Sequence, residues 1–147
     1  MPNKMEKIIP GTLEIANIDY GTGDEFIIKD GITDQDKVSV FLEIADTQKL
    51  RERGLQNRKD LADGHGMLFN KAGAFWMKDV NFPLDLLFLD DMGKILEIIT
   101  MPVDKDGENL YTPTNRNSSM AVELNGGYCD THDIQVGDII LKRDNHE

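Results

Sequence analysis

The chain has 147 residues, a formal net charge of −11 and an isoelectric point near 4.6. This length suits one domain around a single core, and no apolar run approaches the roughly 20 residues that span a bilayer. The acidic balance argues against a nucleic-acid partner, because such proteins carry basic patches. The first residues lack the apolar segment of an export signal, so the sequence predicts a cytoplasmic protein with no membrane partner.

The segment before Lys37 is expected to form an acidic N-terminal β-hairpin extension, residues 1–36. Apolar and polar residues alternate over 12–18, and a second β-like run covers 25–29. Residues 19–24, which are rich in Gly and Asp, form the turn between the two runs. The sequence therefore predicts a hairpin that is an appendage to the main domain.

The next elements are a strand over 38–44 and a short helix over 48–53. Apolar residues alternate along the strand. Asp46 or Thr47 is suited to cap the helix at its N-terminus, and Gly54 is suited to end it. The sequence therefore predicts that the helix begins a few residues after the strand ends.

Four short apolar runs follow in the middle of the chain. They cover 67–69, 75–78, 84–89 and 94–101, and a turn signal at 90–93 separates the last two. Their length is typical of short strands, and a loop that contains Pro83 separates 75–78 from 84–89.

The last third of the chain begins with a long polar loop over 102–117. A strand over 119–124, a helical turn over 126–132 and a strand over 139–142 come next, and residues 144–147 form a polar tail. Many short strands and few helices predict a mainly β (β-rich α+β) fold. We expect an antiparallel sheet curled into a partly open barrel or sandwich, with one or two short helices.

Asp85 is unusual because it stands inside an apolar strand. Leu87 and Leu89 share its face, and the opposite face is also apolar, so the carboxylate is expected to lie at least partly out of water. A buried carboxylate needs hydrogen bonds or a cation, or it takes up a proton. Asp85 is therefore a structural anchor or a site residue.

Trp76, Lys78, Asp79 and Asp85 are the candidate ligand-binding residues. Lys78 would hold an anionic ligand, Asp85 would orient it and Trp76 would form a wall. A like charge on Asp79 would raise one carboxyl pKa toward the range of acid–base work. In the alternative interpretation, Asp85 accepts backbone N–H groups near Pro83 or pairs with Lys78, which fixes the strand register.

No catalytic residue, metal site or cofactor is predicted. Glu43, Glu97 and Glu123 each stand on an expected strand, and an outward polar face is favoured over a calcium or magnesium site. Cys129 is the only cysteine, so no internal disulfide is possible. His132 lies one helical turn from it, but no activated-thiol motif surrounds the pair, so an unreactive cysteine is expected.

A set of ordered motifs resembles a known family. The motifs are Ile44-Ala45-Asp46-Thr47, Arg53-Gly54-Leu55, Gly66-Met67-Leu68-Phe69, Phe75-Trp76-Met77-Lys78, Pro83-Leu84-Asp85 with Phe88, Val122-Glu123-Leu124-Asn125 and Val136-Gly137-Asp138. Their order is similar to that of domain of unknown function family 192, which occurs in bacteria, archaea and phages. The resemblance covers about 37–143 and implies a single compact, mainly β domain without an established activity. The acidic hairpin, the polar Gln56-Asn57 and the short 69–75 link depart from the family pattern.

Three functional hypotheses remain. The first is a non-enzymatic structural or interaction domain with protein partners, as a homo-oligomer or in a larger assembly such as a phage virion. It rests on the family's occurrence in phages and on the missing catalytic constellation. The second is a small-ligand-binding domain or hydrolase-like enzyme that uses the Trp76, Lys78 and Asp85 region. The third is a module whose acidic hairpin imitates an anionic surface and binds a basic protein.

Overall fold

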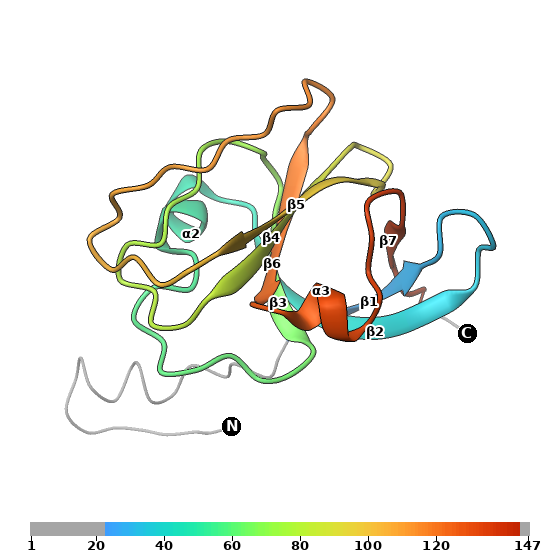
Figure 1. Cartoon of the computed structure of the whole chain (residues 1–147), viewed down its shortest axis with the longest axis horizontal. Helices are drawn as coiled ribbons and strands as arrows, with labels where there is room; N and C mark the ends of the chain where they lie inside the picture. The colour runs from blue at the N-terminus through green and yellow to red at the C-terminus, as the bar shows by residue number, and fades with distance from the viewer. Residues whose placement is uncertain (1–22, 145–147) are drawn as a thin grey trace.

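The computed structural model describes residues 23–144, and within this range seven strands form one sheet (Figure 1). The sheet order is β5-β4-β6-β3-β2-β1-β7, and only the β2–β3 pair is parallel. The strands are β1 (Asp24–Lys29), β2 (Asp36–Ala45), β3 (His65–Phe69), β4 (Leu84–Leu89), β5 (Ile95–Met101), β6 (Met120–Asn125) and β7 (Ile139–Lys142). Two short helices, α2 (Gln48–Arg53) and α3 (Tyr128–Thr131), accompany them. The predicted mainly β fold is confirmed.

The two outer strands of the sheet meet at one end, which curls the sheet into a partly open barrel. The backbone N–H of Ile95 donates to the carbonyl of Asp138, and the N–H of Ile140 donates to the carbonyl of Gly93, each at 2.8 Å. A side chain at Gly93 would stand 2.3 Å from the Ile140 carbonyl oxygen, at a φ of +86°. Only glycine therefore allows this close approach.

The sheet has a hydrophobic core on each face. The inner core fills the barrel and includes Leu87 and Leu89 of β4. The outer core lies against the opposite face and includes Leu84, Leu86 and Phe88. Strand β4 is buried along its whole length, as its two apolar faces predict.

Helix α2 has the predicted bounds and caps. The hydroxyl of Thr47 accepts a hydrogen bond from the backbone N–H of Leu50 at 3.1 Å. At the other end, Gly54 adopts a φ of +50° and its N–H donates to the Leu50 carbonyl at 2.9 Å. These caps satisfy backbone groups that a six-residue helix would otherwise leave open at its ends.

The expected strand over 75–78 is wrong in its extent. Only Phe75 forms a β-bridge, to Tyr111, through two hydrogen bonds of 2.8 Å. We call residues 70–83 the strap, because they cross the outer core between β3 and β4 and are bound there to the 102–119 loop. Phe75 packs on the aromatic rings of Phe69 and Phe88, which holds the strap on the sheet.

The expected N-terminal hairpin is corrected in part. Its first strand, residues 12–18, lies outside the described residues. Its second strand is β1, which pairs with both β2 and β7 and buries Phe26 and Ile28 in the inner core. Residues 24–29 are therefore an integral part of the sheet and not an appendage, because the barrel needs their apolar face to close its core.

Candidate functional site

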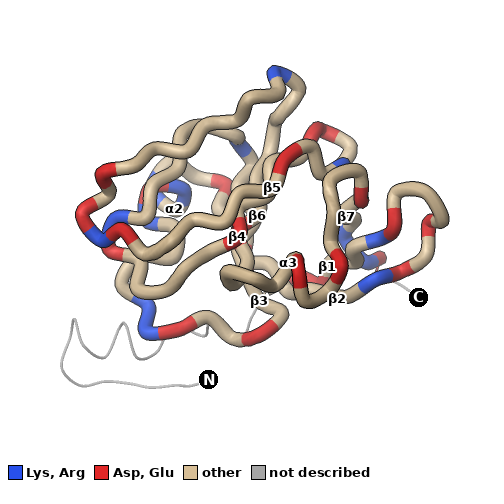
Figure 2. The backbone as a smooth tube through the Cα atoms, viewed as in Figure 1, with Lys and Arg blue, Asp and Glu red and all other residues tan. Residues whose placement is uncertain are grey.

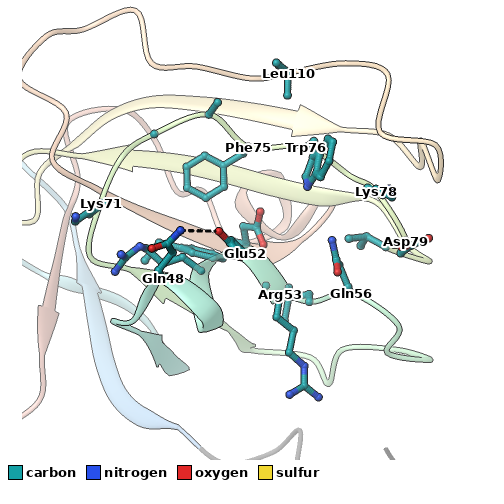
Figure 3. Close-up of a pocket in the computed structure, with 18 residues that line it drawn as sticks. Gln48, Glu52, Arg53, Gln56, Lys71, Phe75, Trp76, Lys78, Asp79 and Leu110 are labelled. Atoms are coloured by element: carbon teal, nitrogen blue, oxygen red, sulfur yellow. Dashed lines mark hydrogen bonds between the residues drawn. The ribbon is translucent and has the colours of Figure 1, made fainter.

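A groove of about 860 Å³ lies between α2 and the strap, over the outer face of the sheet (Figure 3). Figure 3 shows Phe75, Trp76 and Leu110 on one side of it and the α2 side chains Gln48 and Glu52 on the other. Its apolar lining includes Leu55, Phe69, Phe75, Trp76, Val80 and Leu110. Trp76 and Leu110 are 44% and 65% exposed, so apolar surface is open to solvent at the mouth. Cavities of this size commonly hold small molecules.

The groove is locally basic on an acidic chain. Four cationic side chains line it, from Arg51, Arg53, Lys71 and Lys78. Apart from Glu123, only Glu52 and Asp79 oppose them among the lining residues. Figure 2 shows Lys and Arg positions at α2, whereas Asp and Glu are distributed over many of the remaining loops. Opposite charge attracts in such a half-enclosed site more strongly than in bulk water.

Glu123 of β6 also lines the groove, from the sheet. Its neighbours in register are Met67 of β3 and Leu86 of β4, both apolar. The residue is 4% exposed, and its side chain has no hydrogen bond or ion pair with any part of the chain that the structure describes. Burial alone raises the pKa of this carboxyl to about 8, so the group is mostly protonated at neutral pH.

Glu43, on the far side of Met67 from Glu123, has the partner that Glu123 lacks. The guanidinium of Arg58 donates two hydrogen bonds to the Glu43 carboxylate, at 2.6 and 2.8 Å. Glu97 accepts hydrogen bonds from Thr114. The expected outward polar face is therefore wrong for Glu123, because α2 and the strap cover that side of the sheet. Between residues 23 and 144 no three His, Cys, Asp or Glu side chains are grouped as metal ligands.

Asp85 does not line the groove. It is 1% exposed on the inner face of β4 and accepts three hydrogen bonds: from the Thr100 hydroxyl at 2.9 Å, the Gly127 N–H at 3.1 Å and the Cys129 N–H at 2.9 Å. The carboxylate thus joins β4 to β5 and to the start of α3. It is tied to backbone amides, although these belong to residues 127 and 129 and not to the Pro83 turn. It is paired with neither Lys78 nor Asp79.

The three other predicted site residues do lie together. Trp76, Lys78 and Asp79 all line the groove, and the Lys78 ammonium lies 5.4 Å from the centre of the Trp76 ring. Gly107 of the long loop packs on them, since a side chain there would stand 2.8 Å from Lys78 Cβ and 3.1 Å from the indole. The backbone carbonyl of Asp79 accepts a hydrogen bond from Asn57 at 2.8 Å. Both contacts fix the strap where the groove opens.

Cys129 and His132 do not form a nucleophile–base pair. The thiol is buried, and burial raises the pKa of Cys129 well above its usual range. The His132 ring packs instead on Tyr128, with 4.1 Å between ring centres. A thiol that stays protonated is a poor nucleophile, so this arrangement agrees with an unreactive cysteine.

Comparisons with known proteins extend this description. A family profile described as "Uncharacterized ACR" matches residues 31–141. A Sinorhizobium meliloti protein of known structure, described as a candidate transcription regulator, is 26% identical, with a TM-score of 0.71 over 81% of this chain and 92% of that one. A Novosphingobium aromaticivorans protein of unknown function is 23% identical, with a TM-score of 0.69 over 79% of this chain and 82% of its own. No curated protein matches the chain. No helix between residues 23 and 144 is long and apolar enough to cross a membrane.

Proposed function

The chain belongs to domain of unknown function family 192, and we propose that it is a binding domain for small organic anions. The observation that supports this most is the groove itself, which combines an aromatic wall with a cationic mouth on a chain of net charge −11. The flat, apolar part of a ligand would lie against Phe75 and Trp76. Its anionic group would face Lys71 or Lys78, which lie toward opposite ends of the groove (Figure 3).

The lining supports binding rather than hydrolysis. No hydroxyl, thiol or imidazole side chain is among the described residues that line the groove, so they offer no serine–histidine or cysteine–histidine pair for hydrolysis. Asp85, which the hydrolase-like hypothesis uses together with Trp76 and Lys78, does not line the groove and is tied to backbone amides on the other face of its strand. The alternative of a ligand-binding domain therefore has more support than that of an enzyme.

The expected affinity is modest. Burial of a small aromatic body contributes a few kcal/mol, and each exposed ion pair contributes about 1 kcal/mol or less. After the cost of immobilising the ligand, about 4 kcal/mol or less remains, which corresponds to a dissociation constant of about 1 mM or weaker.

Fluorescence titration with anilinonaphthalene sulfonate tests the proposal. This probe is flat and anionic, and Trp76, the only tryptophan, lines the groove, so the change in tryptophan fluorescence reports on binding there. Saturable binding should weaken at least 5-fold in the double variant Lys71→Gln/Lys78→Gln. The matched control Lys49→Gln/Lys94→Gln removes two exposed lysines outside the groove and should bind like the native chain. Equal binding by both variants would contradict the proposal.

The other hypotheses stay predictions. Neither structural relative is described as part of a particle or assembly, so a role in a phage virion or in a homo-oligomer has no added support. The net charge of −11 disfavours the DNA contact that a transcription regulator makes, the role named for the S. meliloti relative. The cytoplasmic location and the binding of a basic protein by the N-terminal segment also stay predictions.

A further inference from the structure

Glu123 indicates which chemical group enters the groove first. We propose that the buried end of the ligand is an uncharged group with a hydrogen-bond donor beside an acceptor, such as a carboxamide or a lactam edge, and that it pairs with the Glu123 carboxyl. The inference rests on the proposed function and deepens it. It adds the identity of the buried group to the anionic group expected at the mouth.

The missing partner of Glu123 is the geometric basis of the proposal. The side chain is 4% exposed, faces the groove, and has only apolar neighbours on β3 and β4. Buried polar groups in folded proteins are nearly always hydrogen-bonded, and leaving one unpaired is costly. Glu43 on the same side of the sheet follows this rule through Arg58. A ligand in the groove would give the Glu123 carboxyl the hydrogen-bond partner that the described part of the protein lacks.

The charges of the groove decide between a neutral group and an ammonium. The charged side chains that line it with Glu123 are Arg51, Glu52 and Arg53 of the α2 wall and Lys71, Lys78 and Asp79 of the strap. With four cations against two acids, an ammonium ligand is repelled at entry. A second carboxylate is disfavoured at the buried end, because it would meet a carboxyl in an apolar environment.

The protonation state of Glu123 favours the same choice. Burial of the side chain is the cause of its raised pKa, so the carboxyl that faces the groove is mostly protonated at neutral pH. A protonated carboxyl offers one O–H and one C=O side by side. A carboxamide or lactam edge complements this pair with two parallel hydrogen bonds.

A matched series of small aromatic acids tests the buried group. Para-carbamoylbenzoate, para-aminomethylbenzoate, terephthalate and para-methylbenzoate share one ring and one carboxylate and differ only at the opposite end. Ligand-observed NMR at neutral pH should show para-carbamoylbenzoate binding at least 10-fold more tightly than para-methylbenzoate. Tightest binding of para-aminomethylbenzoate or of terephthalate would overturn the proposal.

Two variants separate the role of Glu123 from a general effect on the fold. Glu123→Gln keeps a donor and an acceptor in place, so it should bind para-carbamoylbenzoate within about 3-fold of the native chain. Glu123→Leu should lose at least 10-fold for this ligand and keep its affinity for para-methylbenzoate. Circular dichroism checks that both variants fold.

The outcomes also distinguish this inference from the proposed function. Equal affinities for all four acids, unchanged in Glu123→Leu, would overturn the inference and leave an anion-binding groove. If none of the four acids binds and anilinonaphthalene sulfonate also fails, both the inference and the proposed function are wrong.

Discussion

Asp85 and Glu123 are buried carboxyl groups on paired strands, β4 and β6, one residue apart in register and on opposite faces of the sheet. Asp85 accepts three hydrogen bonds, whereas the side chain of Glu123 has no partner in the described part of the chain. Burial alone therefore does not distinguish a structural carboxyl from a candidate site. The donors around each group do, because a fully paired carboxylate has little left to offer a ligand.

The largest expected effect on stability comes from removing the Asp85 carboxylate. Asp85→Ala leaves the buried N–H of Cys129 without an acceptor, breaks the part-buried hydrogen bond of the Gly127 N–H and removes the link to Thr100. The free energy of unfolding should fall by about 3–5 kcal/mol, measured by urea denaturation.

Asp91→Ala, in the exposed turn after β4, is the matched control and should change the free energy of unfolding by less than about 0.5 kcal/mol. A loss below 1 kcal/mol for Asp85→Ala would show that its three hydrogen bonds are not the anchor that the geometry indicates. The folded fraction of the variant should still bind anilinonaphthalene sulfonate, since Asp85 does not line the groove.

The second prediction concerns Glu123 and the change in the free energy of unfolding with pH. The pKa of this carboxyl rises from an ordinary value of 4.5 to about 8 in the folded protein. The folded chain therefore holds a proton that the unfolded chain releases, and this contribution is full below pH 4.5 and is lost as the pH rises to about 8. Over that interval it should lower the free energy of unfolding by roughly 2–4 kcal/mol.

Glu123→Gln isolates this contribution from all other titrating groups. The difference in unfolding free energy between the variant and the native chain should be small at acidic pH and should grow in favour of the variant toward pH 8. A difference independent of pH would mean that the pKa of Glu123 is the same in the folded and the unfolded chain. The raised pKa that burial gives this carboxyl would then be wrong.

The sequence predicts most of the fold because its signals are local. The α2 helix has its cap residue and its terminal glycine in place, and β4 alternates as two apolar faces require. The place of β1 in the sheet depends on contacts between residues that are far apart in sequence. Its alternation predicts a strand, but its pairing with β7 joins residues more than 100 positions apart, and no turn signal reports that contact.

The residues of the candidate site also differ in whether local sequence predicts them. Trp76, Lys78 and Asp79 adjoin in sequence on the strap, so a prediction that groups them needs no knowledge of the fold. Asp85 stands out in sequence because its own strand buries it. Glu123 has the same alternation as any half-exposed strand residue, and only the cover provided by α2 and the strap makes it buried. The apolar residues on both sides of Glu123 could have indicated it, because they are typical of a strand that is covered on both faces.

The smallest expected effect concerns the helix that walls the groove. Thr47→Ala removes the hydroxyl that accepts the Leu50 N–H, whereas Thr47→Ser keeps it. Loss of an N-cap costs about 1 kcal/mol, and α2 has no buried side chain to compensate. We expect Thr47→Ala to weaken anilinonaphthalene sulfonate binding about 2- to 5-fold and Thr47→Ser to bind like the native chain.

Thiol labelling shows whether that loss stays on the groove side of the sheet. Cys129 donates its backbone N–H to Asp85 on the inner face, so its protection from alkylation reports on the Asp85 region. In Thr47→Ala this protection should be unchanged while binding weakens, because the cap and the anchor share no contact. If Cys129 is alkylated faster in Thr47→Ala, to the same degree as binding weakens, the two faces of the sheet unfold locally together. The sheet would then couple the Asp85 anchor to the groove rather than separate them.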